Sequence, residues 1–438
     1  MYTVFYMLRT ILLGAGVFAA LLAVLIFSGK LPVGSGKTAK PQGDVVVWGT
    51  IPQEKLANLL QTFNGDAQTY RVIYQEVRED MFVQTLVEAL ASGRGPDMIL
   101  APQQIILSQS ARLTPFPIAS FPEKSFKDMY VDGASLFFTP QGAIAFPVTI
   151  EPLVLFYNRT LFSKHGLVNP PGYWDEVVSM VPTLTVKNNR EQFLESGIAL
   201  GASNTPYAKE IIMSVVSQLG QVPVLKQYFQ DGSIQASVLA NSPVVEGGDV
   251  LPLTTVARFF TQFADPTKET YTWNAFSGNA DEQFVAEKLA MYIGYSGEYQ
   301  TLRDRNPRAE FAMTYLPQTR GYTTFATGAR IYGVGVLQSS RNPTAAFVVQ
   351  TAFASGAMAG QIASSIGAVP ALRTYASTPG IDPVIGRSML VARGWYDPYF
   401  IQSTGYMTTM ISDIVNNRYG VNDATSLFVS RMQDLYSR

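Results

Sequence analysis

Short apolar runs alternate with helically spaced apolar residues along the first third of the chain. The apolar runs, rich in Val, Ile and Tyr, lie at residues 44–48, 70–77 and 97–101. Between them, apolar residues recur every three or four positions at Leu56, Leu59, Leu60 and Phe63, and again at Phe82, Leu86, Val87 and Leu90. These patterns predict buried strands alternating with amphipathic helices. Such an order favours right-handed crossovers and a mainly parallel sheet, in which ligands bind at the carboxyl ends of the strands.

The same alternation resumes after Pro152. Residues 153–157 (LVLFY) predict another strand, and residues 158–166 predict a short helix that ends at a glycine. A longer helix is expected to begin at Trp174. The only histidine, His165, falls at the end of the short helix, where a positive charge interacts favourably with the helix dipole.

A long uncharged segment precedes this body. Residues 10–27 (TILLGAGVFAALLAVLIF) would form a helix about 27 Å long, close to the roughly 30 Å hydrocarbon core of a bilayer. A cleaved signal peptide is the alternative, but its apolar core is usually about 7–15 residues long and ends at a small-x-small site. We therefore expect a transmembrane signal-anchor, with residues 1–9 as its flank and residues 28–43 as a flexible tether. The cations that follow the segment mildly favour a cytoplasmic tether under the positive-inside rule, so charge alone does not define the topology.

Composition narrows the possible functions. Lys and Arg number 32 and Asp and Glu 33, so a net charge of −1 gives no reason to expect nucleic-acid binding. Hydrophobic residues make up 47% and charged residues only 15%, which suits a large core. The absence of Cys excludes disulfides, thiolate metal sites and a lipid-modified Cys anchor, and a single His excludes a multi-histidine metal site. We expect neither a metal nor a cofactor.

Six short motifs occur in an order typical of one family. They are VWG at 47–49, LASGRGPDMI at 90–99, FYNRTLFSKHGL and PPGYWDE within 156–176, FVAEKLAM at 284–291, LP at 316–317 and NPTAAF at 342–347. Together they resemble the extracellular solute-binding proteins of ABC importers, in the sugar-binding branch related to maltose-binding protein. The run at 156–176 is the most specific match, whereas Glu287 stands where the family motif has Gly.

The resemblance implies a two-lobed α/β fold of the periplasmic-binding-protein type (type II), here preceded by the transmembrane helix. The expected N-terminal lobe comprises residues 44–148 and 319–352, and the expected C-terminal lobe residues 149–318 and 353–438. Asp97, Asn158 and Trp174 are expected to have structural roles: satisfying local backbone groups, forming a strand-to-helix turn and anchoring the core, respectively.

A sugar site combines carboxylates, amides or Arg, which bind hydroxyl pairs, with aromatic rings that cover the C–H faces. The resemblance places Glu151 where the maltose-binding branch contributes a ligand-binding Glu, although a structural carboxylate remains an open alternative. The other candidates lie in the first, third and later strand-end regions, at Trp48, Gln104, Asn204, Tyr207, Tyr295, Ser296, Tyr299 and Trp395. Relatives often carry acidic residues at the Gln104 region and a stacking Trp near Tyr295. For each aromatic candidate, packing in the core is the alternative role.

These features predict a solute-binding protein without enzymatic activity. It would capture a small solute, with a carbohydrate as the first choice, by cleft closure and deliver it to the permease subunits of an ABC transporter. A membrane-tethered sensor of the same fold and a ligand of the oligopeptide or polyamine class remain alternatives. An enzyme is disfavoured, since the run GYSGE at 294–298 lacks the final Gly of a serine elbow. We expect a monomer anchored to the cytoplasmic membrane of a bacterial cell, with its binding domain outside.

Overall fold

The computed structural model describes residues 43–65, 70–228, 234–245 and 248–437. Its contacts divide the chain into two compact units: unit 1 (Met1–Ile150 and Ile331–Thr374) and unit 2 (Glu151–Arg330 and Tyr375–Arg438). The chain therefore passes between the units after Ile150, Arg330 and Thr374. The passages expected from the sequence were after residues 148, 318 and 352. The predicted anchor at residues 10–27 lies outside the described residues.

Long-range hydrogen bonds explain where the chain changes unit. The Gln318 N–H donates to the Gly172 carbonyl at 3.0 Å, and the Thr327 N–H donates to the Val391 carbonyl at 3.3 Å, so the stretch up to Arg330 stays within unit 2. In unit 1, the Ala371 N–H donates to the Val148 carbonyl at 3.1 Å. Bonds of this kind join residues far apart in the sequence and leave no local pattern.

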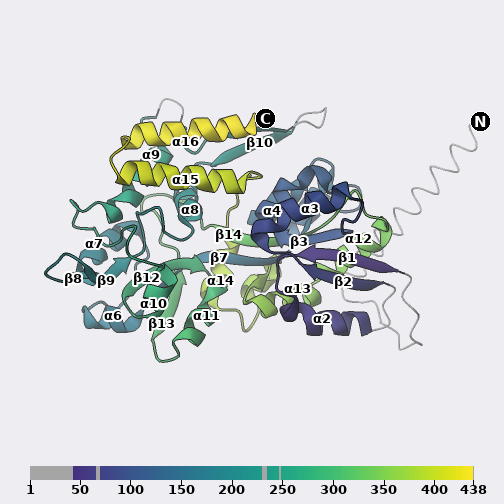
Figure 1. Ribbon diagram of the computed structural model, residues 1–438, viewed down its shortest axis with the longest axis horizontal. Coiled ribbons are helices and arrows are strands. Elements are labelled where there is room, and N and C mark those ends of the chain that lie inside the picture. The colour runs from purple at the N-terminus through teal and green to yellow at the C-terminus, as the bar shows by residue number, and fades with distance from the viewer. Residues whose placement is uncertain (1–42, 66–69, 229–233, 246–247, 438) are drawn as a thin grey trace, which may run out of the picture. The chain divides into compact units, whose positions relative to one another are not determined.

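Unit 1 is built on the predicted strand–helix alternation. Strand β1 (Asp44–Gly49) pairs in parallel with β2 (Arg71–Glu76) and with β3 (Met98–Pro102). The unit 1 part of β14 (Ala329–Val336) continues this sheet antiparallel to β3. In Figure 1, α3 (Phe82–Ala91) and α4 (Gln103–Ser108) lie over one face of these strands, and α2 (Gln53–Gly65) and α13 (Gly356–Ile366) lie over the other. The prediction of a mainly parallel sheet with helices between its strands is confirmed here.

The other elements of unit 1 come from residues 79–143 and 343–370, and all of them except helix α12 are short. They are η1 (Glu79–Met81), η2 (Ser110–Arg112), β4 (Phe116–Pro117), α5 (Glu123–Met129), η3 (Asp132–Phe137), β5 (Phe138–Thr139), β6 (Gly142–Ala143), α12 (Pro343–Phe353) and β15 (Val369–Pro370). The 3₁₀ turn η5 (Arg373–Ser377) begins in unit 1 and ends in unit 2.

In unit 2, the sheet is centred on β7 (Phe146–Asn158), a strand whose 13 residues are all buried. It pairs antiparallel with β12 (Leu289–Tyr295) on one side and with β13 (Phe311–Tyr315) on the other. Beyond β12 the sheet continues with a parallel neighbour, β9 (Phe193–Ile198), and then with β8 (Val186–Lys187). The strand predicted at 153–157 is thus the unit 2 half of a longer strand.

Helices surround this sheet. They are α6 (Arg159–Lys164), α7 (Trp174–Leu184), α8 (Ala208–Gln218), α9 (Pro252–Thr261), α10 (Ala280–Val285), α11 (Glu298–Arg305), α14 (Pro383–Leu390), α15 (Phe400–Val415) and α16 (Val421–Tyr436), with the 3₁₀ turn η4 (Gln262–Ala264) and the hairpin of β10 (Val224–Tyr228) and β11 (Ile234–Val238). Figure 1 shows the two C-terminal helices, α15 and α16, side by side along α8 and α9.

Asp97, Asn158 and Trp174 have structural roles, but the groups that Asp97 binds are distant in the sequence and not local as predicted. Asp97 accepts hydrogen bonds from the Val46 N–H at 3.0 Å, the Ser340 hydroxyl at 2.7 Å and the Arg341 N–H at 3.1 Å. Asn158 caps α6, because its side-chain oxygen accepts from the Leu161 N–H at 3.0 Å. Trp174 begins α7 as predicted, is 5% exposed, and donates from its indole N–H to Gln218 at 2.9 Å.

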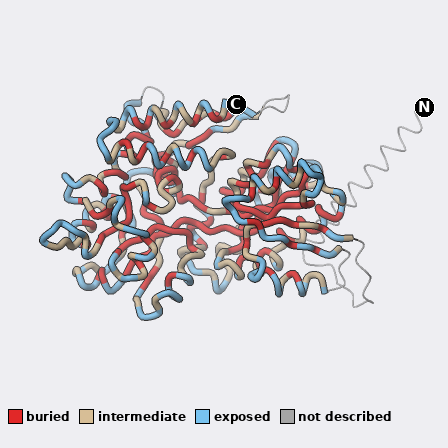
Figure 2. Tube along the Cα trace, viewed as in Figure 1, coloured by how far each residue is buried: buried red, intermediate tan, exposed pale blue. Residues whose placement is uncertain are grey.

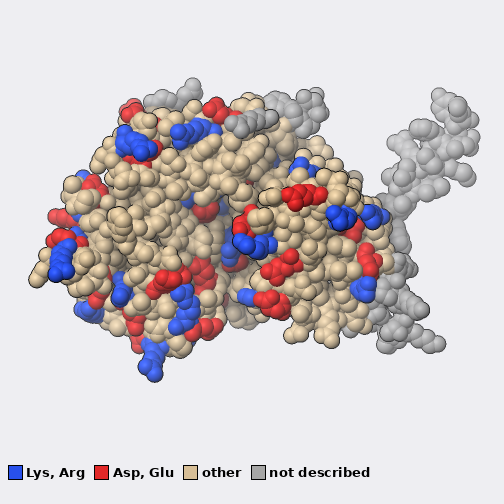
Figure 3. All heavy atoms as spheres, in the orientation of Figure 1, with Lys and Arg blue, Asp and Glu red and all other residues tan. Residues whose placement is uncertain are grey.

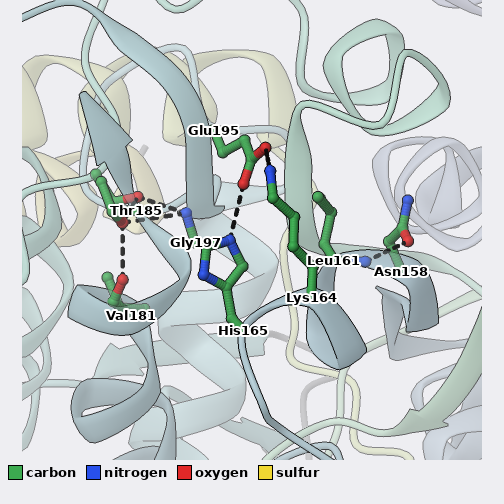
Figure 4. Close-up of polar contacts among 9 residues, drawn as sticks. Asn158, Leu161, Lys164, His165, Val181, Thr185, Glu195 and Gly197 are labelled. Atoms are coloured by element: carbon green, nitrogen blue, oxygen red, sulfur yellow. Dashed lines mark hydrogen bonds and ion pairs between the residues drawn. The ribbon is translucent and has the colours of Figure 1, made fainter. Parts of the chain in front are cut away.

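The short helix α6 is followed by its C-cap residue His165, which Figure 4 shows beside the carboxylate of Glu195 from β9. The His165 Nε2 atom lies 2.8 Å from Glu195 Oε2, and Lys164 pairs with the other oxygen of the same carboxylate. Burial raises the pKa of the Glu195 carboxyl, but its interactions with Lys164 and His165 outweigh this effect and hold the pKa below its ordinary value. The only histidine of the chain is therefore part of a link between α6 and β9, and its predicted place at a helix end is confirmed.

Burial follows the elements closely. Figure 2 shows the central strands of each unit, such as β3 and β12, buried along their length, while the helices expose one side. The outer strand β2 and the hairpin of β10 and β11 are buried at only some positions. Among the described residues, no single helix is both long and apolar enough to cross a membrane; only α12 and α13 taken together, bent by 68°, meet the length and composition for it.

Candidate functional site

The strand pairing of unit 2 brings several predicted ligand-binding residues together. Tyr295, the last residue of β12, pairs with Leu153 of β7, and the Ser296 N–H donates to the Pro152 carbonyl at 2.9 Å. Glu151 lies on the same strand, two positions before Leu153. Residues that the sequence placed separately thus meet at the carboxyl end of β12, as expected for a ligand site on such a sheet.

Glu151 is held by a cation that is distant in the sequence. Its Oε2 atom accepts a hydrogen bond at 2.7 Å from Nη2 of Arg330, a residue 179 positions away. The Glu151 side chain is only 2% exposed, whereas that of Arg330 is 28% exposed. A buried carboxylate requires a partner of this kind, because an unpaired charge in the interior is strongly unfavourable. Both groups keep the planar shape that can bind adjacent hydroxyl groups of a ligand.

Two aromatic rings lie beside this ion pair. The guanidinium carbon of Arg330 is 4.7 Å from the centroid of the Tyr295 ring, within the range of a cation–π contact. The Tyr207 ring packs on Tyr295 with centroids 4.7 Å apart and a tilt of 59°. The cluster therefore combines charged hydrogen-bonding groups with aromatic surface, and both rings belong to the set predicted from the sequence.

A second carboxyl, that of Glu298, closes the cluster. The Tyr292 hydroxyl donates to it at 2.7 Å and the Tyr295 N–H at 2.8 Å, and the Tyr207 hydroxyl is a further partner. Burial raises the pKa of Glu298 above its ordinary value, an effect that these hydrogen bonds only partly offset. The Glu298 carboxyl can come this close to β12 only because residue 294 is a glycine, since a Cβ atom there would lie 2.9 Å from Glu298 Oε2.

Tyr207 reaches this position through an unusual backbone. Its φ of 54° is in the left-handed region, where a residue with a side chain is strained by roughly 1–3 kcal/mol. It precedes α8, and two residues later Lys209 forms a buried ion pair with Asp397 at 2.8 Å, with the Ser403 hydroxyl 3.0 Å from the same ammonium. These contacts connect the start of α8 to residues 397–403. They hold the backbone next to Tyr207 in place and so stabilise its strained conformation.

The other predicted residues of unit 2 lie in different surroundings. The Ser296 hydroxyl is buried and has no hydrogen-bond partner among the described residues. Asn204 donates weakly, at 3.4 Å, to the carbonyls of Asn274 and Ala275. Tyr299 stacks on Phe156 at 6.0 Å and donates to the Phe311 carbonyl, contacts that give its ring a packing role. Trp395 is half-buried against the core of the unit. Their contact with a ligand stays a prediction.

Two predicted residues belong to unit 1. Trp48 is 6% exposed near the end of β1, in register between Gln75 of β2 and Ile99 of β3. Gln104, in the first turn of α4, donates from its amide to Glu79 at 3.0 Å near the surface. Its neighbour Gln103 accepts from the Ile331 N–H at 2.9 Å. The ends of β1 and β3 therefore present neutral amides and a buried indole.

Sequence reasoning missed Arg330 and Glu298. Arg330 is the only charged residue between Arg320 and Arg341, in a run that otherwise reads as turn and strand, and this isolation is a signal that could have marked it. Glu298 was considered only as the residue that breaks a serine-elbow motif. Its burial depends on the three tyrosines around it, which no spacing along the chain reveals.

The distribution of charge limits what the site and the surface can bind. Among the residues that the structure describes, no three His, Asp or Glu side chains are arranged to hold a metal ion. On the face in Figure 3, cationic and anionic side chains are interspersed among a larger uncharged surface. In the cluster itself, Arg330 balances Glu151, and burial favours the neutral form of Glu298. The arrangement suits an uncharged polar ligand.

A family model described as bacterial extracellular solute-binding protein matches residues 49–359, well over half of the chain. The chain belongs to this family. The solute-binding protein is also 24% identical over 307 residues to the osmoprotective compounds-binding protein GgtB of Synechocystis sp., a match that covers 63% of this chain and 72% of the relative.

Solved structures share the fold of this solute-binding protein. The sugar-binding protein MalE of Xanthomonas citri matches with a TM-score of 0.71 and 15% identity, covering 90% of this chain and 97% of that one. The cyclic alpha-maltosyl-1,6-maltose binding protein of Arthrobacter globiformis matches with a TM-score of 0.70 and 17% identity, covering 90% and 98%. The family resemblance and the two-lobed α/β fold predicted from the sequence are thus confirmed, and the family places the protein outside the cytoplasm.

Proposed function

We propose that this protein captures a carbohydrate outside the cytoplasm and delivers it to the permease subunits of an ABC transporter. The observation that carries the proposal is the buried Glu151–Arg330 pair beside the rings of Tyr295 and Tyr207, in a member of a solute-binding family. The structural neighbours described as sugar-binding or maltose-binding proteins support the same ligand class.

The chemistry of the cluster supports a sugar over other solutes. A carboxylate and a guanidinium each bind pairs of hydroxyl groups, and such hydrogen bonds to charged groups contribute about 1.5–3 kcal/mol each. Aromatic rings cover the apolar C–H faces of a sugar ring. A polyamine would require several unpaired carboxylates, whereas Glu151 is already neutralised by Arg330. The osmoprotective compounds named for the GgtB relative add a second set of small solutes to test.

Ligand capture by closure is part of the proposal. A solute shifts the population toward a closed arrangement only if it contacts both units and so binds that arrangement better. The predicted contacts in unit 1, Trp48 and Gln104, would supply the second set. No chemical step is needed, and the proposed role is binding and release, without enzymatic activity.

We also propose that residues 10–27 anchor the protein in the cytoplasmic membrane as a monomer with its binding domain outside. The support is the length of the uncharged run and the tether that follows it. Cell fractionation tests this: the full chain should sediment with membranes, and deletion of residues 10–27 should change that distribution. Sedimentation that is unaffected by the deletion would contradict the anchor.

Calorimetry on the full chain in mild detergent tests the ligand class, with panels of oligosaccharides, small osmoprotectants, peptides and polyamines. A sugar should bind, and small-angle scattering should show a smaller radius of gyration in its presence. Glu151→Gln keeps the shape of the side chain but removes its charge, and should weaken sugar binding about tenfold or more, the size of one charged hydrogen bond.

The matched control is Asp281→Asn, which disrupts the Arg305–Asp281 pair of the same unit. That pair has the same 2.7 Å geometry, but its side chains are 39% and 41% exposed. The control should bind the sugar as the unchanged protein does. Binding of peptides or polyamines alone, or sugar binding that Glu151→Gln leaves unchanged, would refute the proposal.

A further inference from the structure

Unit 2 contains a cavity whose lining shares no residue with the Glu151 cluster. It lies between the edge strand β13 and helix α14, which are neighbours in Figure 1, and has a volume of about 420 Å³. This volume falls within the range of small-molecule sites, about 300–1,000 Å³. Its walls come from four stretches of the chain, at residues 172–173, 314–318, 325–327 and 387–391.

The walls of this cavity are mainly apolar. Tyr173, Tyr315, Leu316 and Phe325 line it with aromatic and aliphatic surface, and Leu390 contributes to its rim. Phe325 is 53% exposed and Leu390 38% exposed, so apolar surface is available for a ligand to cover. Removing such surface from water is the main source of affinity in sites of this kind.

Two polar side chains of the wall, those of Thr327 and Gln318, are already engaged with the protein. The Thr327 hydroxyl donates to the Leu153 carbonyl at 2.8 Å. The Gln318 amide donates to the Leu316 carbonyl at 2.7 Å and accepts from the Ala326 N–H at 3.0 Å. A ligand rich in hydroxyl groups would have to leave many of them without partners here, which costs free energy. The cavity therefore selects a different class of ligand from the Glu151 cluster.

One lining residue adds a positive charge. The guanidinium carbon of Arg387, on α14, lies 5.2 Å from the centroid of the Tyr315 ring. Among the residues that the structure describes, Arg387 forms no ion pair with a carboxylate. An exposed guanidinium at the rim of an apolar cavity is complementary to an anionic group on an apolar body, and Arg binds carboxylates with two parallel hydrogen bonds.

We propose that this cavity is a second ligand site of the protein, specific for a small organic acid. The aromatic or aliphatic body of the acid enters between β13 and α14, against Tyr315, Leu316 and Phe325. Its carboxylate pairs with Arg387. This site is independent of the carbohydrate site and does not rest on its assignment.

Calorimetry on the full chain in mild detergent tests the proposal with 4-phenylbutyrate and octanoate, below their micelle-forming concentrations. Both acids should bind. The neutral analogue 4-phenylbutan-1-ol should bind about tenfold more weakly, and Arg387→Gln should weaken acid binding by a similar factor, because a charge-assisted bond is about twice as strong as a neutral one. Leu390→Asp, which places a carboxylate at the rim, should abolish acid binding.

Two variants serve as controls. Arg431→Gln removes an arginine that also lies over a tyrosine, 5.7 Å from Tyr406, but that is absent from the cavity lining, and it should bind the acids normally. Glu151→Gln alters the carbohydrate site and should also bind them normally. Circular dichroism confirms that each variant is folded. Failure of either acid to bind, equal binding by the alcohol, equal binding by Arg387→Gln, or loss of binding in Glu151→Gln would overturn the proposal.

Discussion

The strand ends of the two units carry different chemistry. In unit 1, the predicted residues near the ends of β1 and β3 are neutral: Trp48 is packed within the sheet, and Gln104 bonds to an exposed Glu79. In unit 2, the end of β12 is surrounded by two carboxyls and a guanidinium, each held by hydrogen bonds or ring contacts. Unit 2 thus combines carboxyl and guanidinium groups at one strand end, while the predicted residues of unit 1 are a buried indole and an amide near the surface.

Backbone geometry follows the same division. Among the described residues, the non-glycine residues with positive φ are Glu191, Tyr207, Glu287 and Asn417, and all four belong to unit 2. In unit 1, the described positive-φ positions are glycines, such as Gly93 and Gly142. Strain of this type persists only where surrounding contacts fix the backbone. Unit 2 therefore contains local backbone strain at four positions, one of which, Tyr207, belongs to the Glu151 cluster.

The largest expected effect comes from breaking one of those interactions. Lys209→Met leaves Asp397 buried without a cation, and should lower the free energy of unfolding by about 3–5 kcal/mol. Urea denaturation followed by circular dichroism and tryptophan fluorescence measures it. In unit 1, Lys124→Met breaks an ion pair whose side chains are 87% and 64% exposed, and should cost less than about 1 kcal/mol.

A double variant separates charge from packing in this pair. Lys209→Met with Asp397→Leu removes both buried charges, and should recover most of the lost stability, because an apolar pair of similar volume is often as stable as a buried ion pair. A double variant no more stable than Lys209→Met would show that the pair acts through its geometry instead. Equal losses in Lys209→Met and Lys124→Met would contradict the contrast between the units.

Ligand affinity provides the next largest difference. Tyr295→Leu removes the ring over which Arg330 lies, and should weaken binding of the carbohydrate by about 1–3 kcal/mol, the range for a buried aromatic anchor. Gln104→Ala in unit 1 removes one amide and should cost about 0.5–1.5 kcal/mol. Calorimetry with the sugar identified by the panel compares them. A larger loss for Gln104→Ala would reverse the proposed division between the units.

The buried carboxyl of Glu298 predicts a pH dependence. Its pKa in the folded protein is raised by burial, so between its unfolded and folded pKa values the folded state binds more protons, and stability falls as the pH rises. The contribution is fully present below the unfolded pKa, near 4.3, and is lost as the pH passes the folded one. One such group changes stability by at most about 1.4 kcal/mol per pH unit.

Glu298→Gln isolates this group. Urea midpoints measured at several pH values above 4 give the stability of the unchanged protein and of the variant. As the pH rises, the unchanged protein should lose stability relative to the variant. A difference that is constant with pH for Glu298→Gln would contradict the assignment.

Much of the fold could be predicted because it is encoded by neighbouring residues. The alternating periodicities at 44–101 mark β1 to β3 and their helices, and Asn158 and Trp174 mark two helix starts. The passages between units could not be located in this way. They depend on backbone bonds such as Gln318 to Gly172, which join distant segments.

The candidate site divides along the same line. Glu151, Tyr207 and Tyr295 could be named as separate candidates from strand ends and family motifs, but their grouping follows from the structure. Arg330 could not, because its partner is 179 positions away and the sequence offers Glu151 no cation nearby. The raised pKa of Glu298 likewise arises from burial among tyrosines on different elements. Interactions across the sheet, not spacing along the chain, define the electrostatics of the site.

The smallest expected effect concerns the strain at Glu287, which precedes β12 with a φ of 57°. Its carboxylate accepts from the Asn158 amide at 3.1 Å, so any substitution loses that bond. Glu287→Ala keeps a Cβ atom in the left-handed region, whereas Glu287→Gly relieves the strain, which is about 1–2 kcal/mol and partly offset by the entropy of glycine. The Gly variant should therefore be about 1 kcal/mol more stable than the Ala variant, as measured by urea denaturation. At the preceding position, where φ is −76°, Ala286→Gly should instead be neutral or destabilising. If Glu287→Ala were as stable as Glu287→Gly, the left-handed backbone at this position would not be strained. Positive φ angles in unit 2 would then not indicate a cost in stability.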